Sequence, residues 1–341
     1  MNQSAFLPFR PILSVAAALI FAASATSARE VVIVNEPEGS VLAGTLAMPE
    51  EAPKAAIVMA TGSGAQDRDE TIFGHKPFKT ISDFLSKNGY AVLRLDDRGV
   101  GGSTGPTENA TTANFSNDIG RAVEWLDSAL TEVPVGVLGH SEGGQIACMV
   151  AASNPKCRFI VTLAAPAWPG DSLVMAQSRA LSMAALGSWP GEIHQRRILD
   201  AVKSQLPSFV AKAIVINELA NTMGDAAKMP QMQQFMMTQA DAVLTPWYRE
   251  FVRFDPTETI KNVGVAWLAL NGDKDMQVPV ENLATIKELN PGAKTVRMAG
   301  HNHLLQSGAK TGLPNEYEEI QEDISEETLA EILKFLSELE L

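Results

Sequence analysis

The chain has 341 residues and a formal net charge of −13, and 45% of its residues are hydrophobic and 20% charged. These values are typical of a globular protein and exclude disordered and collagen-like classes. The length fits one large domain or a domain with an insertion. Because nucleic acid is a polyanion, we expect so acidic a protein to be repelled by it.

The first 28 residues have the features of a secretory signal peptide. Arg10 precedes an apolar run over 12–23, and small residues follow as far as Ala28. The run is shorter than the roughly 20 residues that a membrane span needs, and no cysteine follows it directly that could carry a lipid. We expect residues 1–28 to be removed, the mature chain to be periplasmic or secreted, and no stable membrane insertion after cleavage. A retained amphipathic anchor is the alternative.

Cys148 and Cys157 are the two cysteines of the chain. An oxidising compartment would permit a disulfide between them, provided that their Cα atoms lie within about 7 Å. Their spacing leaves this open. The sequence has no C-x-x-C pair and no Cys/His cluster, so we expect neither a metal nor a cofactor.

In chain order, the first predicted elements alternate between strands and helices. Two β-type runs, 31–34 and 41–48, flank a turn-like segment and predict a hairpin. Later apolar runs cover 55–60, 90–95, 135–138 and 159–163, with helical patterns over 78–88, 117–130 and 142–153. This order predicts an α/β fold with a mostly parallel sheet covered by helices on both faces.

The alternation stops over 171–261, where the composition is mostly helical. It resumes with a strand over 263–270, a helix over 281–289, a strand over 295–298 and a helix over 326–339, for which Ser325 is the expected N-cap. We therefore predict an α/β core formed by 29–170 and 262–341, with 171–261 as a helical cap insertion.

Seven of the thirteen methionines lie in the predicted cap. Because methionine is unbranched and adaptable, several of them are candidates to line an apolar substrate pocket, with ordinary core packing as the alternative. The candidates are Met175, Met183, Met223, Met232, Met236 and Met237.

The stretch Gly139-His140-Ser141-Glu142-Gly143 matches G-x-S-x-G between a predicted strand and a predicted helix. At such a turn the serine backbone is strained, the flanking glycines supply room, and the hydroxyl projects near a helix N-terminus. Ser141 is therefore the candidate nucleophile. The motif is short enough to recur by chance, so it needs a base and an acid elsewhere in the chain.

Two loops that follow later strands offer these partners. One carries Asp273 and Asp275, and the other carries His301 and His303. The order Ser, Asp, His, with each residue after a strand, is that of the α/β-hydrolase plan. The spacing alone does not choose within either pair. We expect His140 to be structural, since it cannot easily fold back onto its neighbour Ser141.

An acyl-transfer site also needs N–H donors for the oxyanion. The N–H of Glu142, which follows the nucleophile, is the expected first donor. The glycine-rich loop over 61–69 would supply the second from Ser63, with Gly64 as the alternative, unless this loop is only a glycine turn with solvated charges. The segment over 98–105 lacks the lysine of a phosphate loop.

Four segments together resemble bacterial α/β-hydrolases of the EstD esterase type, which are neighbours of the serine aminopeptidase-like hydrolases. They are GSGAQDRDE over 62–70, DDRGVGGS over 96–103, GHSEGG over 139–144 and NHLLQ over 302–306. The segments WYREF over 247–251 and FDP over 254–256 also resemble the part of that family that leads out of the cap. The resemblance extends from about Gly39 to the last helix.

The resemblance implies that His303 rather than His301 is the base, and that Asp275 rather than Asp273 is the acid. Thr61 departs from the family, because many relatives have histidine before the oxyanion glycine. This departure leaves the side-chain hydrogen bonding of the loop open.

The resulting hypothesis is a secreted serine hydrolase for small-molecule carboxylic esters of short to medium acyl length. Ser141 would attack the carbonyl, His303 would shuttle the proton and Asp275 would orient the imidazole. One alternative is a serine aminopeptidase, whose amine-binding acid could be Glu142, Asp171 or Glu250. Two further alternatives are an acyltransferase with the same acyl-enzyme and a non-catalytic binding protein.

Overall fold

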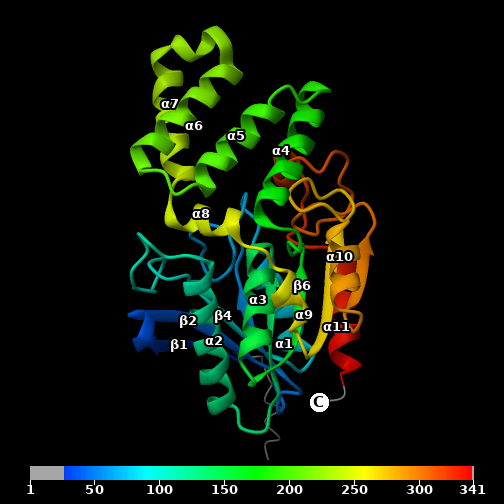
Figure 1. Cartoon of the computed structure of the whole chain (residues 1–341). Coiled ribbons are helices and arrows are strands. Elements are labelled where there is room, and N and C mark those ends of the chain that lie inside the picture. Colours follow the sequence, from blue (N-terminus) through cyan, green and yellow to red (C-terminus); the bar gives the residue numbers. More distant parts are fainter. Residues whose placement is uncertain (1–26, 340–341) are drawn as a thin grey trace, which may run out of the picture.

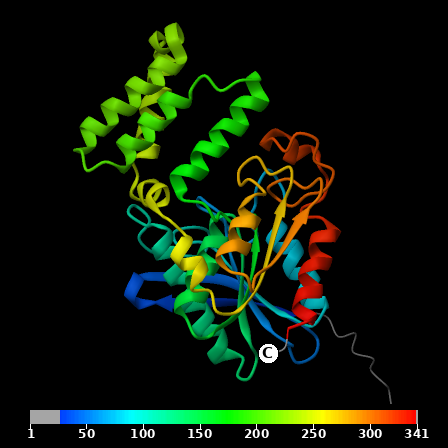
Figure 2. The ribbon, with the colours of Figure 1, turned by 45° about the vertical axis from the view of Figure 1, so that its right-hand side comes forward.

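A single mixed sheet forms the centre of the computed structural model, which describes residues 27–339 (Figures 1 and 2). Its strands are β1 (Ser27–Asn35), β2 (Ser40–Met48), β3 (Ala56–Ala60), β4 (Ala91–Leu95), β5 (Val135–His140), β6 (Cys157–Leu163), β7 (Ala266–Gly272) and β8 (Lys294–Met298). They lie in the order β1-β2-β4-β3-β5-β6-β7-β8. The predicted α/β class is confirmed.

Strands β3 to β8 are parallel, whereas β2 pairs antiparallel with both β1 and β4. The predicted hairpin is confirmed, and η1 (Glu36–Glu38) forms its turn. β1 begins at Ser27, two residues before the predicted mature terminus. The remainder of the predicted signal peptide, residues 1–26, lies outside the described residues.

Helices cover both faces of the sheet, and each face has its own apolar core. On one face, α2 (Thr112–Ala129), α3 (Glu142–Ser153), α9 (Thr257–Lys261) and α10 (Asn282–Leu289) pack against the strands. On the other face, α1 (Pro77–Lys87) and α11 (Glu326–Ser337) do so. β3, β4 and β5 are buried throughout, as continuous apolar strands require.

Between β6 and β7 the chain is helical, as its composition indicates. The elements are α4 (Gly170–Leu186), α5 (Glu192–Lys203), α6 (Ser208–Met223), η2 (Gly224–Lys228), α7 (Pro230–Val243), α8 (Pro246–Arg253) and α9. α5, α6 and α7 extend away from the sheet, while α4 and α8 lie nearer to it (Figure 1). Residues of α4 to α8 share a separate apolar core that includes Val202, Val215 and Ala240. Among residues 27–339 no helix is both long and apolar enough to cross a membrane.

Local hydrogen bonds explain two helix starts. The sequence predicts α2 from residue 117, but α2 begins five residues earlier, because Thr111 and Asn114 form a capping box. The predicted N-cap of α11 is confirmed, since the Ser325 hydroxyl accepts a hydrogen bond from the Thr328 N–H at 3.0 Å. Cys148 on α3 and Cys157 on β6 are both buried free thiols in the structure.

Candidate active site

Ser141 lies at the sharp turn between β5 and α3. Its backbone has φ 54° and ψ −121°, a combination that non-glycine residues seldom adopt. Two close approaches explain the flanking glycines: a β-carbon on Gly139 would overlap the Gly143 carbonyl, and one on Gly143 would overlap the Ala60 carbonyl. The sequence thus permits a turn that holds the Ser141 side chain at the carboxyl end of the central strand.

The Ser141 hydroxyl, the His303 ring and the Asp275 carboxylate form one hydrogen-bonded chain. Ser141 Oγ lies 3.2 Å from His303 Nε2, and His303 Nδ1 lies 2.8 Å from Asp275 Oδ2. The second carboxylate oxygen, Asp275 Oδ1, accepts the N–H groups of Gln277 at 2.8 Å and Val278 at 2.9 Å. The Asp275 carboxylate and the His303 ring are therefore both held in orientation beside a half-buried serine.

The other two candidates for base and acid, His301 and Asp273, form hydrogen bonds with other groups. The ring nitrogens of His301 bond the Ala299 carbonyl at 2.9 Å and the Ser325 hydroxyl at 2.8 Å. Because Ser325 is the N-cap of α11, His301 stabilises the start of that helix. The Asp273 carboxylate accepts the Gly300 N–H at 2.8 Å and pairs with Arg297 at 3.1 Å. Neither side chain faces Ser141.

The loop after β3 lies beside the nucleophile. The Gly62 N–H donates to the Glu70 carboxylate at 2.7 Å, which fixes the peptide just before Ser63. Ser63 lines the cavity that contains Ser141 and His303, whereas Gly64 lines a different cavity. Within residues 27–339 the hydrogen bonds leave the N–H groups of Ser63 and Glu142 without a protein acceptor. Both groups are therefore free to receive an oxyanion.

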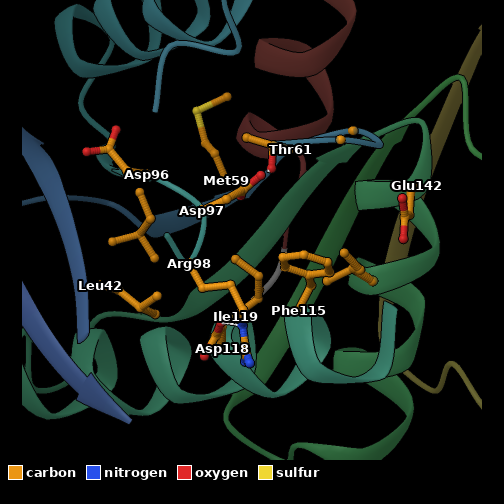
Figure 3. A pocket seen from close by; sticks show the side chains of 14 residues that line it. Leu42, Met59, Thr61, Asp96, Asp97, Arg98, Phe115, Asp118, Ile119 and Glu142 are labelled. Atoms are coloured by element: carbon orange, nitrogen blue, oxygen red, sulfur yellow. Dashed lines mark hydrogen bonds and ion pairs between the residues drawn. The ribbon is translucent and has the colours of Figure 1, made fainter. Parts of the chain in front are cut away.

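Thr61 has its own partner on the opposite loop. Its hydroxyl donates to Asp97 Oδ1 at 2.7 Å, and Asp97 Oδ2 accepts the Gln66 N–H at 2.9 Å. Figure 3 shows Thr61 and Asp97 side by side in the smaller cavity, which Glu142 also lines. Desolvation, aided by the charges of Glu70 and Glu142, raises the pKa of Asp97 to about 7, although its two hydrogen bonds oppose this.

A cavity of about 380 Å³ opens over Ser141 and His303. Aromatic side chains form much of its wall, namely Phe73, Trp247, Tyr248, Phe251 and Tyr317. α4 adds Leu173, Val174 and Gln177. Among the described residues that line it, none is Asp, Glu, Lys or Arg. The volume is in the range of small-molecule sites.

The candidate methionines do not form this wall. None of the six candidates is among the described residues that line the cavity. Met236 is buried in the cap, and Met183 and Met237 are largely exposed. Met175 and Met183 lie on α4, but the residues that α4 gives to the lining are Leu173, Val174 and Gln177. The other four lie on α6 and α7, which give no described residue to the lining.

The three candidate amine-binding acids also lie outside the cavity lining. Glu142 Oε1 accepts the Thr112 hydroxyl at 2.5 Å and the Trp247 indole N–H at 2.9 Å. This second bond ties α8 of the cap to the residue after the nucleophile. Sequence reasoning missed it, because 105 positions separate the two residues. Asp171 pairs with Lys203.

Sequence reasoning also missed how His140 is used. The His140 ring bonds Glu70 on one side and the His303 carbonyl on the other. The only sequence signal was the presence of Glu70 and His140 in two of the family-like segments. In the described part of the chain, no group of three His, Cys, Asp or Glu side chains is placed to hold a metal ion.

Comparisons with known proteins identify the family and the fold. The family model described as the alpha/beta hydrolase fold matches residues 73–309. The chain is 28% identical over 281 residues to the esterase EstD of Thermotoga maritima, which covers 81% of this chain and 61% of that protein. The chain thus spans about three fifths of the length of this curated relative.

Solved structures share the fold. The esterase Pf2001 of Pyrococcus furiosus superposes with a TM-score of 0.56 at 16% identity, covering 92% of this chain and 90% of the other. A thermophilic esterase from Thermogutta terrifontis gives a TM-score of 0.52 at 17% identity, covering 91% and 98%. The family match and the similarity to EstD confirm the resemblance found in the sequence segments, and the superpositions confirm the fold. The chain therefore belongs to the alpha/beta hydrolase fold family.

Proposed function

We propose that this protein is a serine esterase that hydrolyses neutral carboxylic esters of short to medium acyl length. The observation that carries the proposal is the hydrogen-bonded chain Ser141–His303–Asp275 at the floor of a cavity without Asp, Glu, Lys or Arg. The esterases among its relatives and structural neighbours support the same reaction class.

In the first half-reaction, Ser141 Oγ would attack the ester carbonyl carbon while its proton passes to His303 Nε2. The carbonyl oxygen becomes an oxyanion, which the N–H groups of Ser63 and Glu142 would stabilise. Asp275 stabilises the imidazolium through Nδ1–H. The C–O bond then breaks, and the alcohol leaves with the proton from Nε2.

In the second half-reaction, a water molecule would give its proton to His303 and attack the acyl-enzyme carbonyl. The second tetrahedral intermediate collapses, the Ser141 oxygen recovers its proton from Nε2 and the carboxylic acid leaves. These steps need no charged group beyond the His303–Asp275 pair, which suits a cavity whose described lining has no Asp, Glu, Lys or Arg.

The cavity favours esters over aminoacyl amides. A free α-amino group is cationic at neutral pH, and burying it without a carboxylate is costly. Glu142 already binds Thr112 and Trp247, while Asp171 binds Lys203, so neither is available to receive an amine. Glu250, the third candidate, is not among the described residues that line the cavity.

The test is a p-nitrophenyl ester series from acetate to palmitate, run beside an aminoacyl p-nitroanilide. We expect kcat/KM to be highest among the short and medium esters, because longer chains exceed the cavity. Turnover of the anilide with no ester hydrolysis would transfer the assignment to a peptidase. Inactivity on both would contradict hydrolysis and favour the acyltransferase or the binding protein.

We also propose that the protein is exported, with residues 1–28 as a signal peptide. The proposal rests on the sequence pattern of Arg10, the apolar run over 12–23 and the small residues before Arg29.

A further inference from the structure

A fully buried acidic and basic pair lies directly behind the nucleophile. The Glu70 side chain is 0% exposed and the His140 side chain 5% exposed, and His140 Nδ1 lies 2.9 Å from Glu70 Oε1. Neither takes part in the proposed reaction steps. Burying an ionisable pair costs free energy, so the presence of this pair calls for a reason.

The His140 ring also binds the loop after β8 that carries His301 and His303, here called the base loop. Its Nε2 lies 3.0 Å from the backbone carbonyl oxygen of His303. A carbonyl oxygen can only accept, so Nε2 must carry a hydrogen. The His140 and His303 rings lie close together, with their centroids 4.8 Å apart.

The Glu70 end of the pair binds the loop over 61–70, here called the oxyanion loop. Glu70 Oε1, which faces His140, also accepts the Gly62 N–H at 2.7 Å. Gly62 precedes the proposed donor Ser63. Glu70 itself has φ 52°, and Leu305 in the base loop has φ 56°, so both loops contain a residue in a conformation that is rare without glycine.

We infer that Glu70 and His140 form a buried carboxylate–imidazolium pair that positions the oxyanion loop and the base loop on the two sides of Ser141. The positioning role rests on the proposed function, whereas the existence of the charged pair does not depend on it. A continuous chain runs from the Gly62 N–H through Glu70 and His140 to the His303 carbonyl. Both side chains are positioning residues.

The charges around His140 favour its protonated form. Burial alone lowers the pKa of His140, but the charge of Glu70 and the hydrogen bonds to Glu70 and the His303 carbonyl together raise it, with a smaller contribution from Asp275. The titratable groups that face the ring are thus Glu70, His303 and Asp275. A second carboxylate oxygen, Glu70 Oε2, is buried without a partner among the described residues, so the charge of Glu70 is balanced through Oε1.

The geometry leaves little tolerance at the Gly62 end. A β-carbon on Gly62 would lie 3.1 Å from Glu70 Oε1 and 3.4 Å from the Ser141 β-carbon. A side chain at position 62 would thus crowd the carboxylate, which favours glycine there.

The first experiment is nitrogen NMR of the wild-type protein labelled in its five histidines, with assignment through the backbone. We expect the His140 ring to be doubly protonated at pH 8. A His140 ring that carries only one proton at pH 8 would overturn the pair. This measurement needs no variant and no substrate.

The second experiment compares Glu70→Gln with a control, His301→Gln. The control also introduces glutamine at a buried side chain, but this side chain bonds Ala299 and Ser325 rather than His140. In Glu70→Gln the size is kept but the counter-charge is lost, so we expect the second proton to leave His140 at pH 8. We expect kcat for a p-nitrophenyl ester to fall on the order of 10²-fold with KM within about threefold, since small misplacements of reacting groups cost that much. His301→Gln should leave the His140 signals unchanged.

A Glu70→Gln variant with kcat within twofold of the wild type would overturn the positioning role. If that variant does not fold, the wild-type spectrum still decides whether the pair exists. Absence of ester hydrolysis in the wild type would reject the proposed function instead, and the spectrum would remain a separate test.

Discussion

The His303 ring is held at both nitrogens, by Asp275 at one and by Ser141 at the other. Replacing it should remove the only base in contact with the Ser141 hydroxyl among the described residues. We expect His303→Ala to lower kcat by about 10⁴-fold or more.

The control is His301→Ala, two positions away in the same loop. His301 contacts Ala299 and Ser325 rather than the nucleophile, so activity should stay within about tenfold of wild type while thermal stability falls. Steady-state kinetics and melting curves of both variants check this. Comparable activity losses in the two would leave the base unassigned and contradict the account.

Asp97 gives a testable pH dependence. Its pKa is about 7 in the folded protein and about 3.9 for an unperturbed aspartate. Between these values the folded state binds a proton that the unfolded state has released, so the Asp97 contribution to stability decreases as pH rises from about 4 to 7.

Asp97→Asn should remove this contribution. The asparagine can keep both hydrogen bonds, accepting from the Gln66 N–H and donating to the Thr61 hydroxyl. We expect the decrease in urea midpoint between pH 5 and pH 8 to be smaller in the variant than in the wild type. An equal decrease in both would show that Asp97 does not titrate in this window.

At the level of single residues, Ser141 could be predicted because the elbow requires glycines on both sides of it. Spacing narrowed the candidate base and the candidate acid only to pairs, since positions 301 and 303 belong to one loop and either could reach the serine. The preference for His303 and Asp275 came from the family resemblance. The choice depends on how that loop turns, through Asn302, whose side-chain oxygen accepts the N–H groups of Leu304 and Gln306. Such a turn has no periodic signature in the sequence.

At the scale of elements, the elbow depends on α3 starting directly against β3. Gly143→Ala would drive a methyl group into the Ala60 carbonyl, and backbone on both sides resists movement. We expect a destabilisation of about 1–3 kcal/mol and a fall in kcat on the order of 10²-fold. Gly264→Ala is the matched control, because nothing lies within 4 Å of a β-carbon there. Denaturant melts and ester kinetics test this, and equal behaviour of the two variants would contradict it.

Strands and core helices could be predicted because their burial produces an apolar pattern. The predicted range of α3 coincides with the observed one, whereas the start of α2 was missed because the capping box uses asparagine in place of the usual glutamate or glutamine. The contact between Trp247 on α8 and Glu142 on α3 could not be predicted, since it depends on how the helices between β6 and β7 fold back over the sheet.

For the whole molecule, the export proposal concerns residues 1–28, of which 1–26 lie outside the described residues. We expect the protein recovered from the periplasm or medium of an expressing bacterium to begin at Arg29, as determined by N-terminal sequencing. An unprocessed amino terminus in a membrane fraction would favour the retained anchor instead.

The cavity joins segments that are far apart in the chain, from the loop after β3 to α4, α8 and the base loop. Its aromatic wall and its volume could therefore not be predicted from composition.

Covalent trapping would identify the nucleophile, which we propose is Ser141. A p-nitrophenyl alkylphosphonate should phosphonylate the active serine and release p-nitrophenolate, and peptide mapping by mass spectrometry should find one adduct, on Ser141. The adduct should form far more slowly in His303→Ala. An enzyme that hydrolyses esters yet carries no adduct on Ser141, or carries it on another residue, would contradict the account.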